Sequence, residues 1–430
     1  MLKYPVPMKN LLLITLITIA LTGFNMADTL VCPHYEIKLS IDPADQYITV
    51  ECSWDIPHGD SSNTIHFYLH RELLIEELTI NEKVAYTVST DTSDIRYMPY
   101  ATRYSLNTQS LKNDKMTLYL KYSGRITEWP EWSANVIGED WTEMGSYFPW
   151  YPLNRDYGPF TYEVEVFTDD DYRTFMMGTG AVDNNWALYR AEEPTNDMVF
   201  CASKNLKTEK KEIYQYNFWL AHSTFPDSLI NTLTSDIRQI LLLYNRWFPP
   251  GGNTMCMVES MREKGGAYAR LGGIYLPGFT EADYHELRKP YTRYLAHEIA
   301  HLWWHRADAN TWEDWLNEGF AEYSALMVLR ELYGPEYFEE WTARKVKSSA
   351  GTDPVWQYDR NGEQAYTILY DKAPLLLYEL EGRIGLDALK QVMWNLLLNK
   401  VSTTYEFKRI LTDLEGEETA EWFIRKLQEQ

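Results

Sequence analysis

The sequence predicts an α+β protein in which an N-terminal all-β domain precedes a mainly helical domain, because the patterning of the chain changes once. Between about residues 32 and 220 the apolar runs are short, alternate with polar residues and are separated by turn signals such as Asp42-Pro43-Ala44-Asp45, as in half-buried strands. From Pro226 onward the runs lengthen and take helical spacing. The sequence contains neither internal repeats nor a low-complexity linker, so we expect the two domains to pack directly, with a cleft between them.

The first element is an apolar run over residues 11–21, preceded by Lys3 and Lys9. This run is shorter than the ~20 residues of a transmembrane helix and suits the apolar core of a signal peptide. Residues 1–27 are therefore predicted to be a signal peptide, with Ala27 as a candidate for the cleavage site. The protein is expected to be exported, either secreted or periplasmic. The alternative is an uncleaved N-terminal segment that tethers the protein to a membrane.

Strands are predicted next, within a β-domain over residues 28–222. Alternating runs occur at residues 45–52, 64–69, 116–122 and 212–220. The four cysteines are Cys32, Cys52, Cys201 and Cys256. None has the C-x-x-C spacing of a cysteine zinc site. In an exported protein Cys32 and Cys52 are candidates for a disulfide, and free buried thiols are the alternative.

The helical domain is predicted over residues 223–430. Apolar residues with amphipathic spacing predict its first helix over residues 228–247, and Pro249-Pro250-Gly251-Gly252 ends it. A strand over residues 254–259 and a glycine-bearing segment to Pro277 follow, and helices then dominate to Gln430.

The composition of the chain limits the binding partners that we expect. The net charge of -22 argues against nucleic acid and against anionic membrane surfaces, since both would repel the chain. The hydrophobic content of 45% is ordinary for a globular protein.

Residues 297–301, His-Glu-Ile-Ala-His, carry the strongest chemical signal. On a helix His297 and His301 lie one turn apart on one face, so both imidazoles can bind a single ion. Glu298 is placed to take a proton from a water at that metal. This pattern predicts a catalytic zinc site. The alternative is a surface helix that carries two histidines by chance.

The third metal ligand follows by elimination. His305 continues the spacing, but a straight helix places it about 12 Å along the axis from His297, too far to share an ion. In zinc proteases whose third histidine comes from the same stretch, a glycine turns the chain. Here Trp304 stands at the glycine position and Ala307 at the histidine position. Glu318 is the remaining candidate. It follows the histidines by 16 intervening residues and is expected on a second helix packed on the first.

Glu322 lies one helical turn beyond Glu318. Its carboxylate either accepts a hydrogen bond from a ligand histidine and orients it, or is a solvated helix carboxylate.

The segments HEIAHLWW and WLNEGFAEY resemble the membrane alanyl aminopeptidase family, the gluzincin metallopeptidases that include aminopeptidase N and leukotriene hydrolase. Residues 35–42, 148–152, 162–166 and 367–373 extend the resemblance over nearly all of the mature chain. It implies a saddle-like β-domain, a thermolysin-like catalytic domain and one Zn²⁺ per chain. It also implies a peptide or protein substrate. The 60 residues after Tyr370 leave no room for the family's C-terminal helical domain.

The resemblance also assigns roles around the substrate. Tyr370 matches the tyrosine that stabilises the oxyanion in the family, and a phenol can donate that hydrogen bond. Gly266 and Ala267 match its substrate-binding segment, where an edge strand with glycines can pair with an extended peptide.

Two departures from the family motif concern the free amine of a substrate. Ala269 replaces the glutamate that holds this amine, and Arg270 replaces an asparagine. An inward-pointing Arg270 would add repulsion. Glu263 and Glu322 are the candidates to replace the lost acid. The predicted function is therefore an aminopeptidase-like zinc peptidase. The alternatives are a metallo-endopeptidase, a peptidase of altered end-specificity, and a non-catalytic peptide-binding protein.

Overall fold

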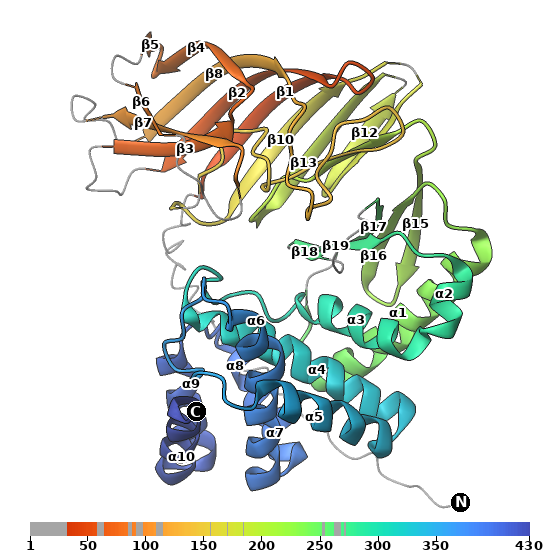
Figure 1. Ribbon diagram of the computed structural model, residues 1–430, viewed down its shortest axis with the longest axis vertical. Coiled ribbons are helices and arrows are strands. Elements are labelled where there is room, and N and C mark those ends of the chain that lie inside the picture. The colour runs from red at the N-terminus through yellow and green to blue at the C-terminus, as the bar shows by residue number, and fades with distance from the viewer. Residues whose placement is uncertain are drawn as a thin grey trace, which may run out of the picture. The chain divides into compact units, whose positions relative to one another are not determined.

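Strands occupy the first half of the chain and helices the second, so the predicted α+β class is confirmed (Figure 1). The computed structural model describes residues 32–57, 64–84, 88–91, 98–108, 115–154, 156–169, 171–183, 185–251, 254–261, 268–270 and 272–430. The predicted signal peptide lies outside the described residues, as do Glu263, Gly266 and Ala267. Within the described part, no helix combines the length and apolarity needed to cross a bilayer. Residues 32–430 form one compact unit.

An eight-stranded sheet dominates the N-terminal part. Its strand order is β12-β13-β10-β1-β2-β8-β4-β5. The strands are β1 (His34–Asp42), β2 (Tyr47–Pro57), β4 (Leu74–Ile80), β5 (Lys83–Val84), β8 (Lys115–Arg125), β10 (Phe160–Phe167), β12 (Thr179–Asp183) and β13 (Trp186–Thr195). Strand β1 pairs parallel to β10 and antiparallel to β2, with Ile37 opposite Val164 and Cys52. Every second residue of β1 is buried, as expected for a sheet with one face on a core.

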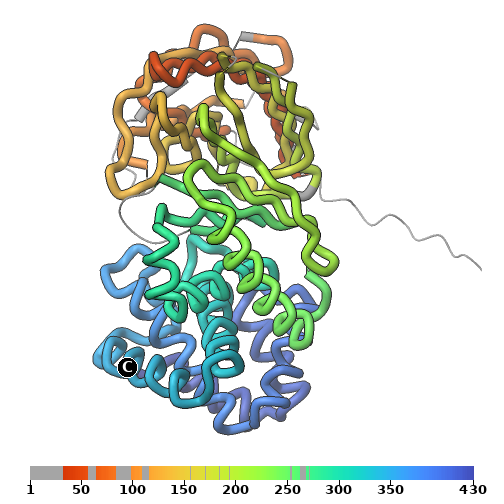
Figure 2. The backbone as a smooth tube through the Cα atoms, turned by 90° about the vertical axis from the view of Figure 1, so that its right-hand side faces the viewer, coloured from red at the N-terminus to blue at the C-terminus, as the bar shows by residue number. Residues whose placement is uncertain are grey.

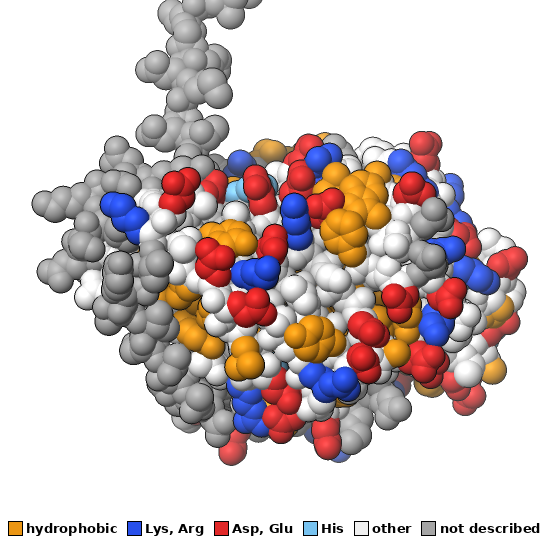
Figure 3. Space-filling view, turned by 90° about the horizontal axis from the view of Figure 1, so that it is seen from above, with side chains coloured by type: hydrophobic (Ala, Val, Ile, Leu, Met, Phe, Trp, Pro, Cys, Tyr) orange, Lys and Arg blue, Asp and Glu red, His pale blue; other side chains and the backbone are white. Residues whose placement is uncertain are grey.

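The two faces of this sheet differ. The buried face carries stacked aromatic rings, such as Tyr35 and Trp54 with centroids 5.3 Å apart. Viewed from above, this end of the protein shows acidic and basic side chains interspersed (Figure 3). Lys121, for example, lies 3.5 Å from Glu51 on the neighbouring strand.

Two three-stranded sheets complete the N-terminal part. One has the order β3-β7-β6 and the other β11-β14-β9. Their strands are β3 (Thr64–His70), β6 (Val88–Asp91), β7 (Ala101–Asn107), β9 (Thr142–Met144), β11 (Arg173–Met176) and β14 (Phe200–Ser203). All four cysteines are free, so Cys32 and Cys52 are not joined.

A mixed sheet of order β15-β16-β17-β19-β18 begins the helical part. Its strands are β15 (Lys207–Ile213), β16 (Tyr216–His222), β17 (Thr254–Ser260), β18 (Tyr268–Arg270) and β19 (Gly273–Pro277). Helix α1 (Asp227–Trp247) connects the parallel strands β16 and β17 and packs along them (Figure 2). Strands β15 and β16 thus belong to this sheet, although the sequence analysis assigned residues up to 222 to the β-domain. Alternation identifies a strand but not its partner strands.

Helices follow to the C-terminus. They are α2 (Glu281–Glu286), α3 (Arg288–Ala300), α4 (Trp315–Tyr333), α5 (Pro335–Ser349), α6 (Ala365–Thr367), α7 (Ala373–Ile384), α8 (Leu386–Leu398), α9 (Thr404–Glu415) and α10 (Glu417–Gln428), with a 3₁₀ turn at Trp312–Asp314 and a π-helix at Ile368–Lys372. Helix α4 is central, because it is buried along most of its length and contacts α3, α5 and α7.

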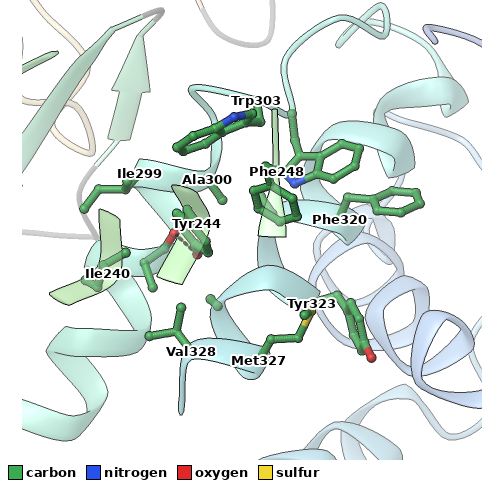
Figure 4. Packing of buried hydrophobic residues seen from close by; sticks show 14 of the residues in the cluster. Ile240, Tyr244, Phe248, Ile299, Ala300, Trp303, Phe320, Tyr323, Met327 and Val328 are labelled. Carbon is green, nitrogen blue, oxygen red and sulfur yellow. Dashed lines mark hydrogen bonds between the residues drawn. The ribbon is translucent and has the colours of Figure 1, made fainter. Parts of the chain in front are cut away.

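An aromatic core fixes the back of helix α3 (Figure 4). Tyr244 of α1 donates a hydrogen bond of 2.7 Å to the carbonyl of Ala296, one residue before the His-Glu-Ile-Ala-His segment. Its ring packs edge-on against Trp303 and stacks on Phe248. Aromatic pairs contribute about 0.5–1.5 kcal/mol each beyond their buried area. These contacts hold the end of α3 in one orientation.

A buried charge pair joins strand β18 to the N-terminal strands. Arg270 Nε donates to Asp197 Oδ2 at 2.7 Å, and the Asp197 side chain is buried while that of Arg270 is 14% exposed. Asp197 also accepts hydrogen bonds from the backbone and hydroxyl of Ser146 and from the hydroxyl of Tyr151. The Arg270 guanidinium lies over the ring of Tyr268 as well, 4.7 Å from its centroid.

Asp197→Ala is expected to lower the free energy of unfolding by about 3–5 kcal/mol, because it leaves Arg270 buried without its counter-charge. Denaturant unfolding measures this loss. Glu163→Ala is the control, since it breaks an ion pair with Arg190 whose two side chains are about half exposed, and it is expected to change stability little. Equal losses of stability in the two variants would contradict a stabilising role of the buried pair between Asp197 and Arg270.

Candidate metal centre

Three side chains from two helices converge at the centre of the helical part. His297 lies in the last turn of α3, His301 caps that helix, and Glu318 lies in the first turn of α4. Glu318 Oε2 is 3.2 Å from Nε2 of His297 and 3.5 Å from Nε2 of His301. Ligands bound at about 2.0–2.1 Å to a tetrahedral ion lie roughly 3.3 Å apart. The separations therefore match a single metal ion.

The donor set fits zinc in particular. Two imidazoles and one carboxylate form the three-ligand set of hydrolytic zinc sites. Glu318 Oε2 is buried and makes no hydrogen bond with the described residues, although both Nε2 atoms face it. A buried carboxylate oxygen without a hydrogen bond is costly, and a cation bound by all three atoms removes that cost.

Hydrogen bonds behind the histidines fix their orientation. His297 Nδ1 lies 3.0 Å from Glu322 Oε2, and His301 Nδ1 lies 2.8 Å from the carbonyl oxygen of Trp304. An acceptor at Nδ1 places the proton there, which leaves the Nε2 lone pair for the metal. Glu322 is fully buried, so it is not a solvated helix carboxylate. It is the carboxylate that orients the ligand His297.

Two cations hold the Glu322 carboxylate in its charged form. Arg293 Nη1 lies 2.6 Å from each carboxylate oxygen, and Lys345 Nζ lies 2.6 Å from Oε1. Burial acts to raise the pKa of Glu322, but the charges of Arg293 and Lys345 outweigh it and hold this pKa well below its ordinary range.

The two residues with predicted catalytic roles lie beside the ligand atoms. Glu298 is buried, and burial raises its pKa, as suits a group that must accept and return a proton near neutral pH. The ring of Tyr370 lies 5.4 Å from that of His297. Burial, with the charges of Glu318 and Glu298 adding to it, raises the pKa of Tyr370 well above its ordinary value, so its hydroxyl keeps the proton it would donate.

His305 takes no part in the cluster. Its Nδ1 lies 2.8 Å from the backbone oxygen of His301, and burial lowers its pKa to about 4. It lies beyond the end of helix α3, in the segment between α3 and α4.

The substrate-binding segment is described only in part, since Gly266 and Ala267 lie outside the described residues. Ala269 and Arg270 form edge strand β18, in register with Ile274 and Gly273 of β19. Arg270 adds no repulsion, because Asp197 neutralises it. Glu322 does not replace the lost acid, because it is bound to His297, Arg293 and Lys345.

Several residues that build the site are not predicted from the sequence. Arg293 precedes His297 by four residues, and this spacing was the signal that a helix would place both on one face. Lys345, Asp197 and Glu143 gave no local signal. Glu143 is buried and accepts hydrogen bonds from Trp141 and from the hydroxyl of Tyr268.

Residues 280–426 match the model of the Peptidase family M1 domain, and no curated protein sequence matches the chain. An M1 zinc metallopeptidase from Deinococcus radiodurans is similar, with a TM-score of 0.67 and 16% identity over 92% of this chain and 93% of that one. A mutant of an M1 zinc metallopeptidase from Deinococcus radiodurans bound to a Tyr-Ser-Ala substrate gives 0.68 and 15% over 92% and 94%.

Leukotriene A4 hydrolase from Saccharomyces cerevisiae gives a TM-score of 0.69 and 17% identity over 91% of this chain and 66% of that one. The chain has the two-domain fold of M1 zinc metallopeptidases. Residues 280–426 match the peptidase family M1 domain, so the predicted resemblance is confirmed.

Glu322→Gln is expected to weaken zinc binding about 10- to 100-fold, because outer partners of ligand histidines have effects of this size. Competition with a chromophoric chelator measures the dissociation constant. The matched control is Glu331→Gln, an exposed carboxylate on the same helix α4. Unchanged affinity in Glu322→Gln would show that Glu322 does not act on His297.

Proposed function

We propose that this protein is an exported, zinc-dependent peptidase that hydrolyses peptide bonds near the N-terminus of its substrates. The observation that carries the proposal is the convergence of His297, His301 and Glu318 with Glu298 and Tyr370 beside them. One zinc ion per chain, held by the two histidines and Glu318, would supply Lewis acidity.

The remaining chemistry belongs to two side chains. Glu298 takes the proton of the attacking water and passes it to the leaving amine, as a general base and then a general acid. Tyr370 donates a hydrogen bond to the oxyanion that forms on the scissile carbonyl. The peptide itself is expected to extend along the edge of β18, the last strand of its sheet. A bound Tyr-Ser-Ala substrate in a structurally similar enzyme supports a peptide as substrate.

The preference for a free amine is the open part of the specificity. An ammonium group near the zinc needs a carboxylate that is not already paired. Of the carboxylates that contact β18 among the described residues, Asp197 is bound to Arg270 and Glu143 to Tyr268. Together with Ala269, this favours an enzyme that accepts a free amine but gains little from it. A peptidase of altered end-specificity is therefore the second candidate.

Three substitutions separate metal binding from turnover. Glu318→Ala is expected to strip the zinc, because two ligands do not complete a hydrolytic site. Glu298→Gln should keep the zinc and lose nearly all turnover. Tyr370→Phe should lower kcat about 10²- to 10³-fold with little change in KM, comparable to the loss of one oxyanion donor. Elemental analysis and steady-state kinetics on a peptide substrate measure these effects. Full zinc in Glu318→Ala at low free metal would refute the ligand assignment.

The amine preference is measured by kcat/KM for a chromogenic amino acid amide and for its N-acetylated form. We expect the free amine to be preferred by well under 10³-fold, about 4 kcal/mol. Ala269→Glu should raise the activity on the free amine and leave that on the acetylated form nearly unchanged. A preference above about 10³-fold in the wild type would show that another acid holds the amine.

A further inference from the structure

Lys345 occupies an unusual position for a lysine. It lies on the buried face of α5, one helical turn after Thr342 and two turns after Phe338, and is 3% exposed. An apolar residue would fill this place without the cost of burying a charge. The position is therefore explained by what the ammonium group contacts.

The three N–H donors of the ammonium group meet three acceptors from two elements. Nζ lies 2.6 Å from Oε1 of Glu322, 2.7 Å from the backbone oxygen of Tyr370 and 3.2 Å from Oδ1 of Asp371. Glu322 contacts the ligand His297. Lys345 thus touches both the carboxylate behind the metal ligand and the backbone of the oxyanion-binding residue.

The backbone at Tyr370 needs such support. Residues 368–372 form a π-helix, in which the N–H of Ala373 bonds to the carbonyl of Ile368. A widened turn interrupts the i to i−4 hydrogen-bond ladder and often marks a functional site. Nζ of Lys345 binds a carbonyl of this turn, and Ser348 of the same helix donates to Asp371 at 2.7 Å.

We propose that Lys345 is a positioning residue that ties Glu322 to the π-turn, so that the metal ligand His297 and the hydroxyl of Tyr370 keep a fixed separation. The inference rests on the proposed function for its catalytic half. Its other half, the orientation of His297 through Glu322, concerns the zinc affinity alone.

The test uses Lys345→Met, which fills the same space without donors, and Lys347→Met, an exposed position on α5, as the matched control. We expect Lys345→Met to weaken zinc binding about 10-fold or more. At saturating zinc it should lower kcat about 10-fold or more with KM within about threefold. The control should match the wild type in all three values.

A double-mutant cycle isolates the effect on Tyr370. In the Tyr370→Phe background the hydroxyl that Lys345 positions is gone, so Lys345→Met should lower kcat further by less than about threefold. A full 10-fold further loss would overturn the link to Tyr370, and wild-type zinc affinity in Lys345→Met would overturn the link to His297. A variant that only melts at lower temperature, with normal zinc affinity and kcat, would reduce Lys345 to a structural residue.

If Lys345→Met does not fold, Asp371→Ala decides, since it removes a contact of the π-turn and leaves Glu322 paired. It should lower kcat and keep the zinc affinity, and an unchanged kcat overturns the proposal. A wild-type protein that binds zinc but cleaves no peptide would refute the proposed function, and the zinc affinity of Lys345→Met would then decide the inference.

Discussion

The metal centre depends on the ion pairs and the hydrogen bond that the buried Glu322 carboxylate makes. An isolated carboxylate in the interior is expensive, and burial becomes tolerable only with opposite charges and complete hydrogen bonding. Glu322 has both, from Arg293, Lys345 and His297. Arg293 and His297 connect Glu322 to helix α3, and Lys345 connects it to α5 and the π-turn. One charge thus links α3, α5 and the π-turn to helix α4.

The aromatic packing behind α3 complements this charge network. Glu322 of α4 orients His297, while Tyr244 and Trp303 pack in the aromatic core at the end of α3 (Figure 4). Trp303 also donates a hydrogen bond to the carbonyl of Pro249, so the chain just after the helix is fixed as well. Catalytic side chains must be held within a fraction of an ångström of their working positions. The aromatic packing and the directed hydrogen bonds together restrict the end of α3 and the ring of His297.

Patterns within a short stretch of the sequence predicted the features that depend only on nearby residues. The i, i+4 spacing identified His297 and His301, and elimination against His305 indicated Glu318, because helix geometry is fixed by sequence distance. The partners that orient these ligands come from far along the chain, and nothing around Lys345 or Asp197 shows which carboxylate or cation it will face. The same limit explains β15 and β16: alternation predicted one strand over residues 212–220, where the structure has the end of β15, a turn and most of β16. Alternation also did not indicate that β16 pairs with β17. The sequence does not show whether Arg270 points inward and repels a substrate amine, because its counter-charge, Asp197, is 73 residues away.

This last pair bears on how the substrate end of the site is built. The resemblance places a glutamate and an asparagine where this chain has Ala269 and Arg270. Replacing only the glutamate would leave a polar edge strand without an anchor for the amine. The arginine instead gives β18 a different partner, because its guanidinium reaches Asp197 between β13 and β14 and lies over the rings of Tyr147 and Tyr268. Paired with Glu143 through Tyr268, the strand is held to the N-terminal part by two buried carboxylates. Asp197 and Glu143 could bind a substrate ammonium group, but here they fix the edge strand β18. The position of a substrate peptide along β18 would therefore depend on the contact between the N-terminal part and the helical part of the chain.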